Sequence, residues 1–152
     1  MLLGVLCAAF ILFNGSQKSE QSNARSDVIV QQVKTAVHAD DSTQTKYTIN
    51  RYVRKSAHVI EYALFGFFAG LAVGAWKIMK GRMHVAAAIA SLLALAVTDE
   101  FIQSFQNRTA LVEDIVLDAG GGLTGIGLAL LICGVFLLIR MKRNAKKKDA
   151  AA

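Results

Sequence analysis

The chain has 152 residues, of which 54% are hydrophobic and 18% are charged, and its formal net charge is +6. This composition excludes an intrinsically disordered polymer and favours a small integral membrane protein of one domain. The positive charge does not indicate a nucleic-acid partner, because much of it lies in a short tail after the last apolar run. A basic tail in that position is explained by the positive-inside rule and by anionic lipid.

Residues 1–13 form the first apolar run. As a helix they would rise about 20 Å, which is short of the roughly 30 Å hydrocarbon core of a bilayer. The run lacks the charged start and the small-residue cleavage site of a signal peptide. Leu6 precedes Cys7 where a lipoprotein cleavage site needs a small residue. We therefore predict a short or truncated first transmembrane helix.

Residues 14–50 are polar and predict an extracytoplasmic loop. Within this loop, Val30, Val33, Ala36 and Val37 recur at helical spacing, which favours a short amphipathic helix at the interface. A partly ordered linker is the alternative. Asn50 is a candidate N-cap for a helix that begins near residue 51.

Residues 51–139 predict a core of three transmembrane helices, over about 56–76, 85–105 and 112–139, followed by a basic cytoplasmic tail over 140–152. Gly66, Gly70 and Gly74 repeat every fourth residue, a spacing that lets membrane helices pack closely. The two cysteines suggest neither a disulfide framework nor a metal site. The predicted fold class is all-α, an integral membrane helical bundle of about four transmembrane helices.

Ionisable residues occur in each of the last three apolar segments. Along a helix that rises about 1.5 Å per residue, Glu61, Glu100 and Asp118 lie about 24, 27 and 33 Å from the basic residue at the far end of the same segment. Because the hydrocarbon core is about 30 Å thick, all three lie near one membrane surface, opposite the basic one. Basic residues favour the cytoplasmic side, so we expect this polar cluster on the extracytoplasmic side.

Polar side chains in membrane helices are costly and by default mark a functional site inside the bundle. The alternative is that these groups only hold the helices together through ion pairs. The expected ligand-binding residues are Lys55, His58, Glu61, Tyr62, Asp99, Glu100, Gln103, Arg108, Asp114 and Asp118.

Catalysis by this cluster would use His58 as an acid or base, oriented by Glu61, Asp99 or Glu100, with a basic residue such as Arg108 holding an anionic group. No serine or cysteine is placed as an obvious nucleophile, so a binding role is favoured over an enzymatic one. A single histidine among scattered carboxylates is weakly specific for metal. We therefore expect no metal and no other cofactor.

The order and spacing of these residues resemble the VanZ-like family over roughly residues 52–139. The pattern is Arg54-Lys55-x-x-His58-x-x-Glu61-Tyr62, then Asp99-Glu100-x-x-Gln103, then Arg108 with Asp114 and Asp118 ahead of a glycine-rich helix. The resemblance implies a multi-pass protein of the bacterial cytoplasmic membrane, in a family associated with resistance to the glycopeptide teicoplanin.

From this resemblance we expect a cell-envelope protein that affects antibiotic susceptibility. Its polar cluster would bind a lipid-linked or anionic ligand, such as a cell-wall precursor or a glycopeptide, and its other partner would be membrane lipid. The alternative is a membrane-embedded hydrolase or transferase that acts on a lipid-linked substrate with His58 and the carboxylates as acid and base.

Overall fold

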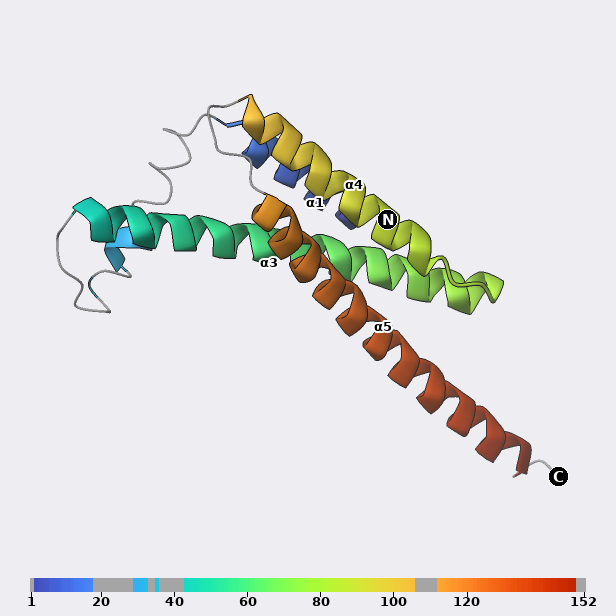
Figure 1. The fold of residues 1–152 in the computed structure, drawn as a ribbon. Coiled ribbons are helices and arrows are strands. Elements are labelled where there is room, and N and C mark those ends of the chain that lie inside the picture. Colours follow the sequence, from blue (N-terminus) through green and yellow to red (C-terminus); the bar gives the residue numbers. More distant parts are fainter. Residues whose placement is uncertain (1, 18–28, 33–34, 36–42, 106–111, 150–152) are drawn as a thin grey trace.

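The computed structural model describes residues 2–17, 29–32, 35, 43–105 and 112–149. Its principal elements are the helices α1 (Leu2–Gly15), α3 (Thr43–Lys80), α4 (Val85–Ser104) and α5 (Val112–Asp149) (Figure 1). Within these described ranges there is no strand. The all-α fold class is therefore confirmed.

Three of the helices are long and apolar enough to cross a membrane: Thr45–Lys80, Val85–Ser104 and Val112–Lys147. The fourth, α1, is apolar but has only 14 residues, which correspond to a rise of about 20 Å. The chain is thus a helical membrane protein with three long apolar helices and one short one, as its apolar runs predict.

Two helices extend beyond their predicted limits. The helix α3 begins at Thr43, so Asn50 lies inside it and does not cap it. The helix α5 continues through the basic tail to Asp149. Apolar runs mark only the part of a helix that lies in hydrocarbon, and the polar flanks contain no glycine or proline to end it. Of the predicted amphipathic helix, Val30 is helical and buried, whereas residues 33, 36 and 37 lie outside the described part.

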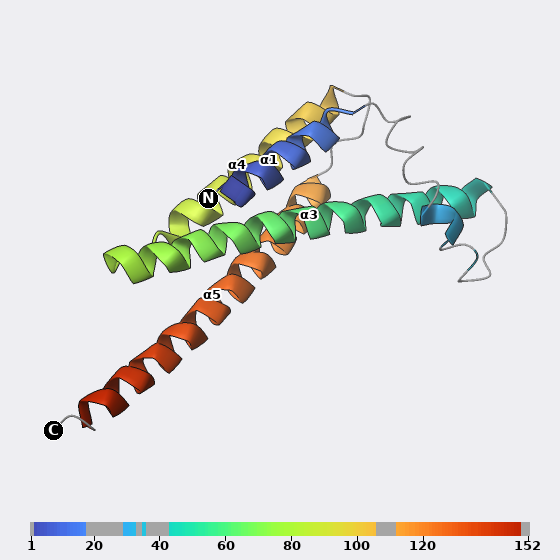
Figure 2. The ribbon, with the colours of Figure 1, turned by 180° about the vertical axis from the view of Figure 1, so that it is seen from behind.

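The helices α3 and α5 cross at close range (Figures 1 and 2). A Cβ atom built on Gly66 would overlap the carbonyl oxygen of Gly122, and one on Gly125 would overlap the carbonyl oxygen of Ala63. These positions therefore require glycine if the two backbones are to keep their separation. The glycines at every fourth position of α3 allow close packing against α5, as predicted.

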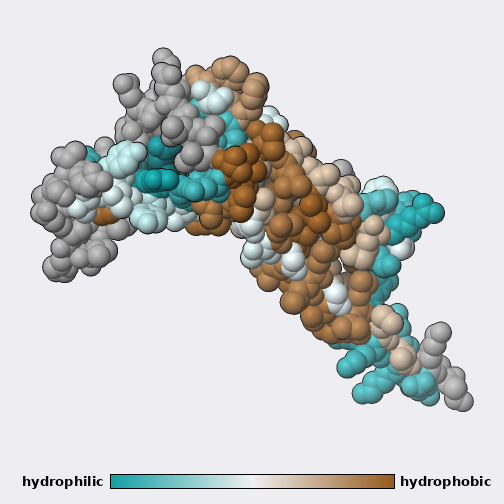
Figure 3. All heavy atoms as spheres, in the orientation of Figure 1, coloured by the Kyte–Doolittle hydropathy of each residue, from teal (hydrophilic) through white to brown (hydrophobic). Residues whose placement is uncertain are grey.

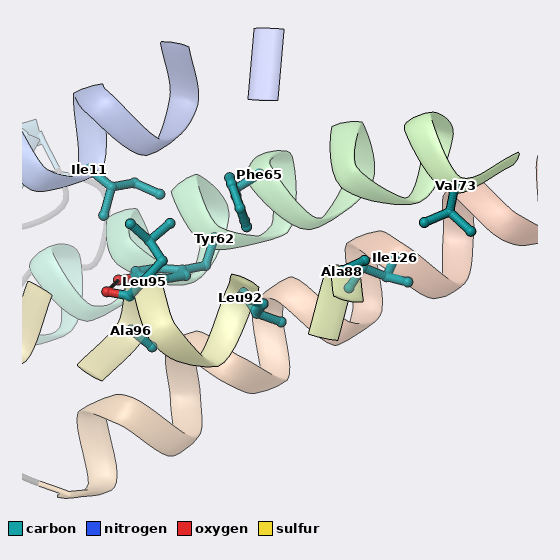
Figure 4. Close-up of a cluster of buried hydrophobic side chains, with 9 residues drawn as sticks. All are labelled: Ile11, Tyr62, Phe65, Val73, Ala88, Leu92, Leu95, Ala96 and Ile126. Atoms are coloured by element: carbon teal, nitrogen blue, oxygen red, sulfur yellow. Dashed lines mark hydrogen bonds between the residues drawn. The ribbon is translucent and has the colours of Figure 1, made fainter. Parts of the chain in front are cut away.

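The helices α1 and α4 lie side by side against α3 (Figures 1 and 2). Where they meet α3 and α5, a buried apolar cluster forms the core of the bundle. Figure 4 shows its members: Ile11, Tyr62, Phe65, Val73, Ala88, Leu92, Leu95, Ala96 and Ile126. All four helices contribute to this core, so the short α1 is an integral part of the bundle.

The surface changes from polar to apolar and back along the molecule. Figure 3 shows a hydrophobic middle between hydrophilic surface over the N-terminal half of α3 on one side and, on the other, hydrophilic surface at the far end of α5 and where α3 turns into α4. In the hydrophobic middle, large apolar side chains of α5 such as Leu131 and Phe136 are exposed. An exposed apolar band between polar ends is what contact with lipid requires.

Candidate functional site

An ion pair between two helices forms the partly exposed edge of the polar cluster. The Nζ atom of Lys55, in α3, pairs with Oδ1 of Asp114, in the first turn of α5, and their side chains are 24% and 26% exposed. Arg54 is half-buried beside them, and its charge is also attracted to Asp114. Two cations thus share one carboxylate at the edge of the cluster.

Further inside, α3 and α4 bring a histidine and a carboxylate together. The Nδ1 atom of His58 lies 3.7 Å from Oδ2 of Asp99, and the Asp99 side chain is fully buried. Gln103, one turn further along α4, donates a hydrogen bond from Nε2 to the same Asp99 oxygen at 2.9 Å. The glutamine therefore fixes the orientation of the Asp99 carboxylate towards His58.

The end of α1 also reaches the cluster. Asn14 donates a hydrogen bond from Nδ2 to Oε1 of Glu61 at 3.0 Å, and a Cβ atom on Gly15 would overlap the Asp99 carboxylate. Neither residue was predicted as part of the site. The sequence shows only that an asparagine and a glycine follow an apolar run directly, and these residue types are equally typical of the start of a loop.

Tyr62 occupies a different environment from its polar neighbours. It is fully buried in the apolar core, and its hydroxyl donates a hydrogen bond to the carbonyl oxygen of Leu95 at 3.5 Å. The same hydroxyl also lies beside the Asp99 carboxylate. Tyr62 therefore lies in the apolar core (Figure 4) and reaches the polar cluster with its hydroxyl.

Two more predicted residues, Glu100 and Asp118, are buried on α4 and α5. Asp118 experiences electrostatic repulsion from the carboxylates of Asp99, Glu100, Asp114 and Glu61. The interior of the cluster is thus strongly acidic, whereas its edge carries the cations. Of the ten predicted residues, Arg108 lies outside the described part of the chain.

The sequence predicts that polar groups from three separate segments gather in one layer. The structure brings α3, α4 and α5 together through the Lys55–Asp114 pair and through the grouping of His58, Asp99 and Asp118. Such an arrangement offers cations to an anion at its edge and an acid–base pair, or a cation-binding set, further inside.

A separate apolar hollow of about 470 Å³ lies along the N-terminal half of α3. Its lining includes Tyr52, Val53, Ala57 and Ile60. At 3.6 residues per turn, Val53, Ala57 and Ile60 lie on the side of α3 roughly opposite to Lys55. The hollow therefore does not belong to the polar site.

The family model described as VanZ/LLP1 matches residues 1–137, which includes α1, α3, α4 and most of α5. No curated protein matches the chain. No solved structure matches it either.

Proposed function

This chain belongs to the VanZ-like family, and from that premise we propose that it binds a lipid-linked or anionic ligand of the bacterial cell envelope at its polar cluster. Binding takes place at the extracytoplasmic end of the helices and alters susceptibility to glycopeptides such as teicoplanin. The ligand is a cell-wall precursor carrying phosphate groups, or the glycopeptide itself.

One observation carries this proposal: two half-buried cations, Arg54 and Lys55, lie at the accessible edge of a polar layer shared by four helices. The ion pair between Lys55 and Asp114 is partly exposed, and such pairs contribute little stability. An anionic group that approaches this edge can therefore replace Asp114 as the partner of Lys55. The fork of Arg54 would add two parallel hydrogen bonds to a phosphate or carboxylate.

The test is the teicoplanin susceptibility of a sensitive bacterial host that expresses the protein. We expect the wild-type chain to raise the minimal inhibitory concentration, and Lys55→Gln or Arg54→Gln to remove most of that increase. Lys80→Gln, an exposed charge change at the other end of α3, is the matched control and should behave as wild type. Equal effects of Lys55→Gln and Lys80→Gln at equal expression would contradict the proposal.

A second candidate function is favoured by the geometry around His58. A histidine next to a buried aspartate, which is itself oriented by Gln103, is the arrangement of a general base. It would act in a membrane-embedded hydrolase or transferase on a lipid-linked substrate.

The two candidates separate in one assay, the release of inorganic phosphate from an isoprenoid diphosphate by the purified protein. A hydrolase releases phosphate, and His58→Gln abolishes the release. A binding protein releases none, and His58→Gln retains a measurable part of the effect on teicoplanin susceptibility.

A further inference from the structure

Three side chains with metal-binding atoms converge inside the cluster from three different helices. His58 of α3, Asp99 of α4 and Asp118 of α5 each offer one such atom, and these atoms all lie within 4.8 Å of one another. They are separated in sequence by 41 and 19 residues (99 − 58 and 118 − 99), so the tertiary fold, and no local motif, creates the grouping. It lies deeper than the Lys55–Asp114 pair and is distinct from it.

Asp118 lies among other carboxylates. Its side chain is 2% exposed, and within the described ranges it forms no hydrogen bond or ion pair. The charges that act on it in those ranges belong to four carboxylates, and Lys55, at the edge of the cluster, is paired with Asp114. A buried carboxylate without a partner is costly, and more so among other carboxylates. A cation bound between Asp118, Asp99 and His58 would remove this cost.

The distance between His58 and Asp99 is close to that between two ligands of one metal ion. His58 Nδ1 and Asp99 Oδ2 are 3.7 Å apart, longer than a hydrogen bond. Two ligands of a tetrahedral ion with bonds of about 2.0–2.1 Å lie about 3.3 Å apart. A shift of a few tenths of an ångström would therefore bring these two atoms to ligand spacing. Gln103, which holds Asp99 from the outside, is the kind of supporting contact that metal ligands usually have.

A further oxygen is available from the next turn of α3. Glu61 accepts the hydrogen bond from Asn14 on Oε1, while its buried Oε2 has no hydrogen-bond partner among the described residues. Glu61 interacts electrostatically with both Asp99 and Asp118. The C-terminal end of α1, which carries partial negative charge, also closes against Asp99 at Gly15. Each of these features favours a cation.

We propose that His58, Asp99 and Asp118 bind a single divalent transition-metal ion, Zn²⁺ or Mn²⁺, with Glu61 as a fourth or supporting ligand. One imidazole nitrogen with two or three carboxylate oxygens suits these ions, whereas Mg²⁺ and Ca²⁺ prefer oxygen ligands alone. The proposal goes beyond the ligand-binding function above and does not depend on it.

The experiment uses the full chain, purified in detergent without a histidine tag and stripped of metal with a chelator. Titration calorimetry with Zn²⁺, Mn²⁺, Mg²⁺ and Ca²⁺ measures affinity, and elemental analysis after desalting measures stoichiometry. We expect about one Zn²⁺ or Mn²⁺ per chain and weak or no binding of Mg²⁺ and Ca²⁺. Asp118→Asn and His58→Gln should each weaken binding by more than about tenfold, since changes outside the ligand set already cost that much.

Glu113→Gln is the matched control. It removes a carboxylate from the same first turns of α5 at an exposed position, and it should leave metal affinity unchanged. No Zn²⁺ or Mn²⁺ binding by the wild type would overturn the proposal. Binding that survives unchanged in Asp118→Asn and His58→Gln would also overturn it, because the metal would then sit elsewhere on the chain.

Thermal unfolding in detergent distinguishes a loss of metal binding from a loss of folding in the variants. Zn²⁺ or Mn²⁺ should raise the unfolding temperature of the wild type, as a ligand of the native state does. In the absence of metal, Asp118→Asn should unfold at a higher temperature than the wild type, because it removes a buried negative charge, and metal should not stabilise it further. If metal-free Asp118→Asn is instead less stable than the wild type, Asp118 holds the helices together by itself, and the proposal is wrong.

Discussion

At the scale of single residues, Asn14 connects the short helix α1 to the polar cluster. Its hydrogen bond to Glu61 is partly buried and joins residues 47 positions apart. A hydrogen bond within a protein contributes about 0.5–1.5 kcal/mol. Asn14 therefore does more than end an apolar run: it fixes the position of α1 against α3.

This contact predicts coupling between Asn14 and Glu61. Asn14→Ala and Glu61→Met should each lower the unfolding temperature in detergent, and the double variant should lose less than the two single losses combined. The expected coupling energy is about 0.5–3 kcal/mol in a double-mutant cycle. Ser16→Ala is the control, because the Ser16 hydroxyl donates to the nearby carbonyl of Phe13 at an exposed position. Strict additivity would mean that the contact contributes nothing.

Individual site residues could be predicted from the sequence where a charge interrupts an apolar run. His58, Asp99 and Asp118 stand out in this way, and the structure groups them. Asn14 and Gly15 could not be predicted, because they follow an apolar run at the point where a loop is equally expected. Their role depends on where α1 lies against α3 and α4, and no local pattern encodes that position.

At the scale of helices, the α3–α5 crossing depends on glycines that face the partner helix. Gly125 packs against the backbone at Ala63, whereas Gly127, two residues along the same helix, has open space where its Cβ would be. The two positions therefore form a matched pair with the same residue type in the same helix.

We predict that Gly125→Ala lowers the stability of the protein by about 1–3 kcal/mol, the usual cost of overpacking. Gly127→Ala should be neutral or slightly stabilising, because alanine is favoured over glycine in a helix by up to about 1 kcal/mol. Thermal unfolding in detergent measures both. Equal destabilisation by the two changes would show that glycine is needed here for a reason other than the approach of α3.

Helix positions could be predicted well and helix ends less so. The helix α4, predicted over 85–105, is observed at Val85–Ser104, because its apolar run begins at Val85 and the polar residues that interrupt this run near its end are not helix breakers. By contrast, α3 begins eight residues before the predicted position 51 (51 − 43), since its first turns are polar yet contain no residue that breaks a helix. Hydrophobic patterns locate the membrane-embedded part of a helix, while its polar extension depends on local propensity.

At the scale of the whole molecule, basic residues gather at one end and the acidic cluster lies towards the other. Lys77 and Lys80 end α3, and the last turns of α5 carry the basic tail. The hydrophobic band between these ends is visible in Figure 3. The positive-inside rule predicts that the basic end lies in the cytoplasm.

This orientation is testable by cysteine labelling in a variant whose two native cysteines are replaced by alanine. A membrane-impermeant maleimide added to intact cells should label Glu113→Cys, at the exposed start of α5. It should label Lys146→Cys, near the end of α5, only after the cells are permeabilised. The opposite pattern would place the cluster on the cytoplasmic side and would contradict the proposed access of an envelope ligand.

The contribution of α1 to the cluster constrains how the protein is assembled. During synthesis α1 leaves the ribosome first, whereas Glu61, Asp99 and Asp118 follow on helices made later. Asn14 and Gly15 can therefore reach Glu61 and Asp99 only after α3 and α4 have been synthesised. Completion of the site thus requires α1 to pack against helices that are made after it, and Asp118, on α5, is the last of its residues to be added.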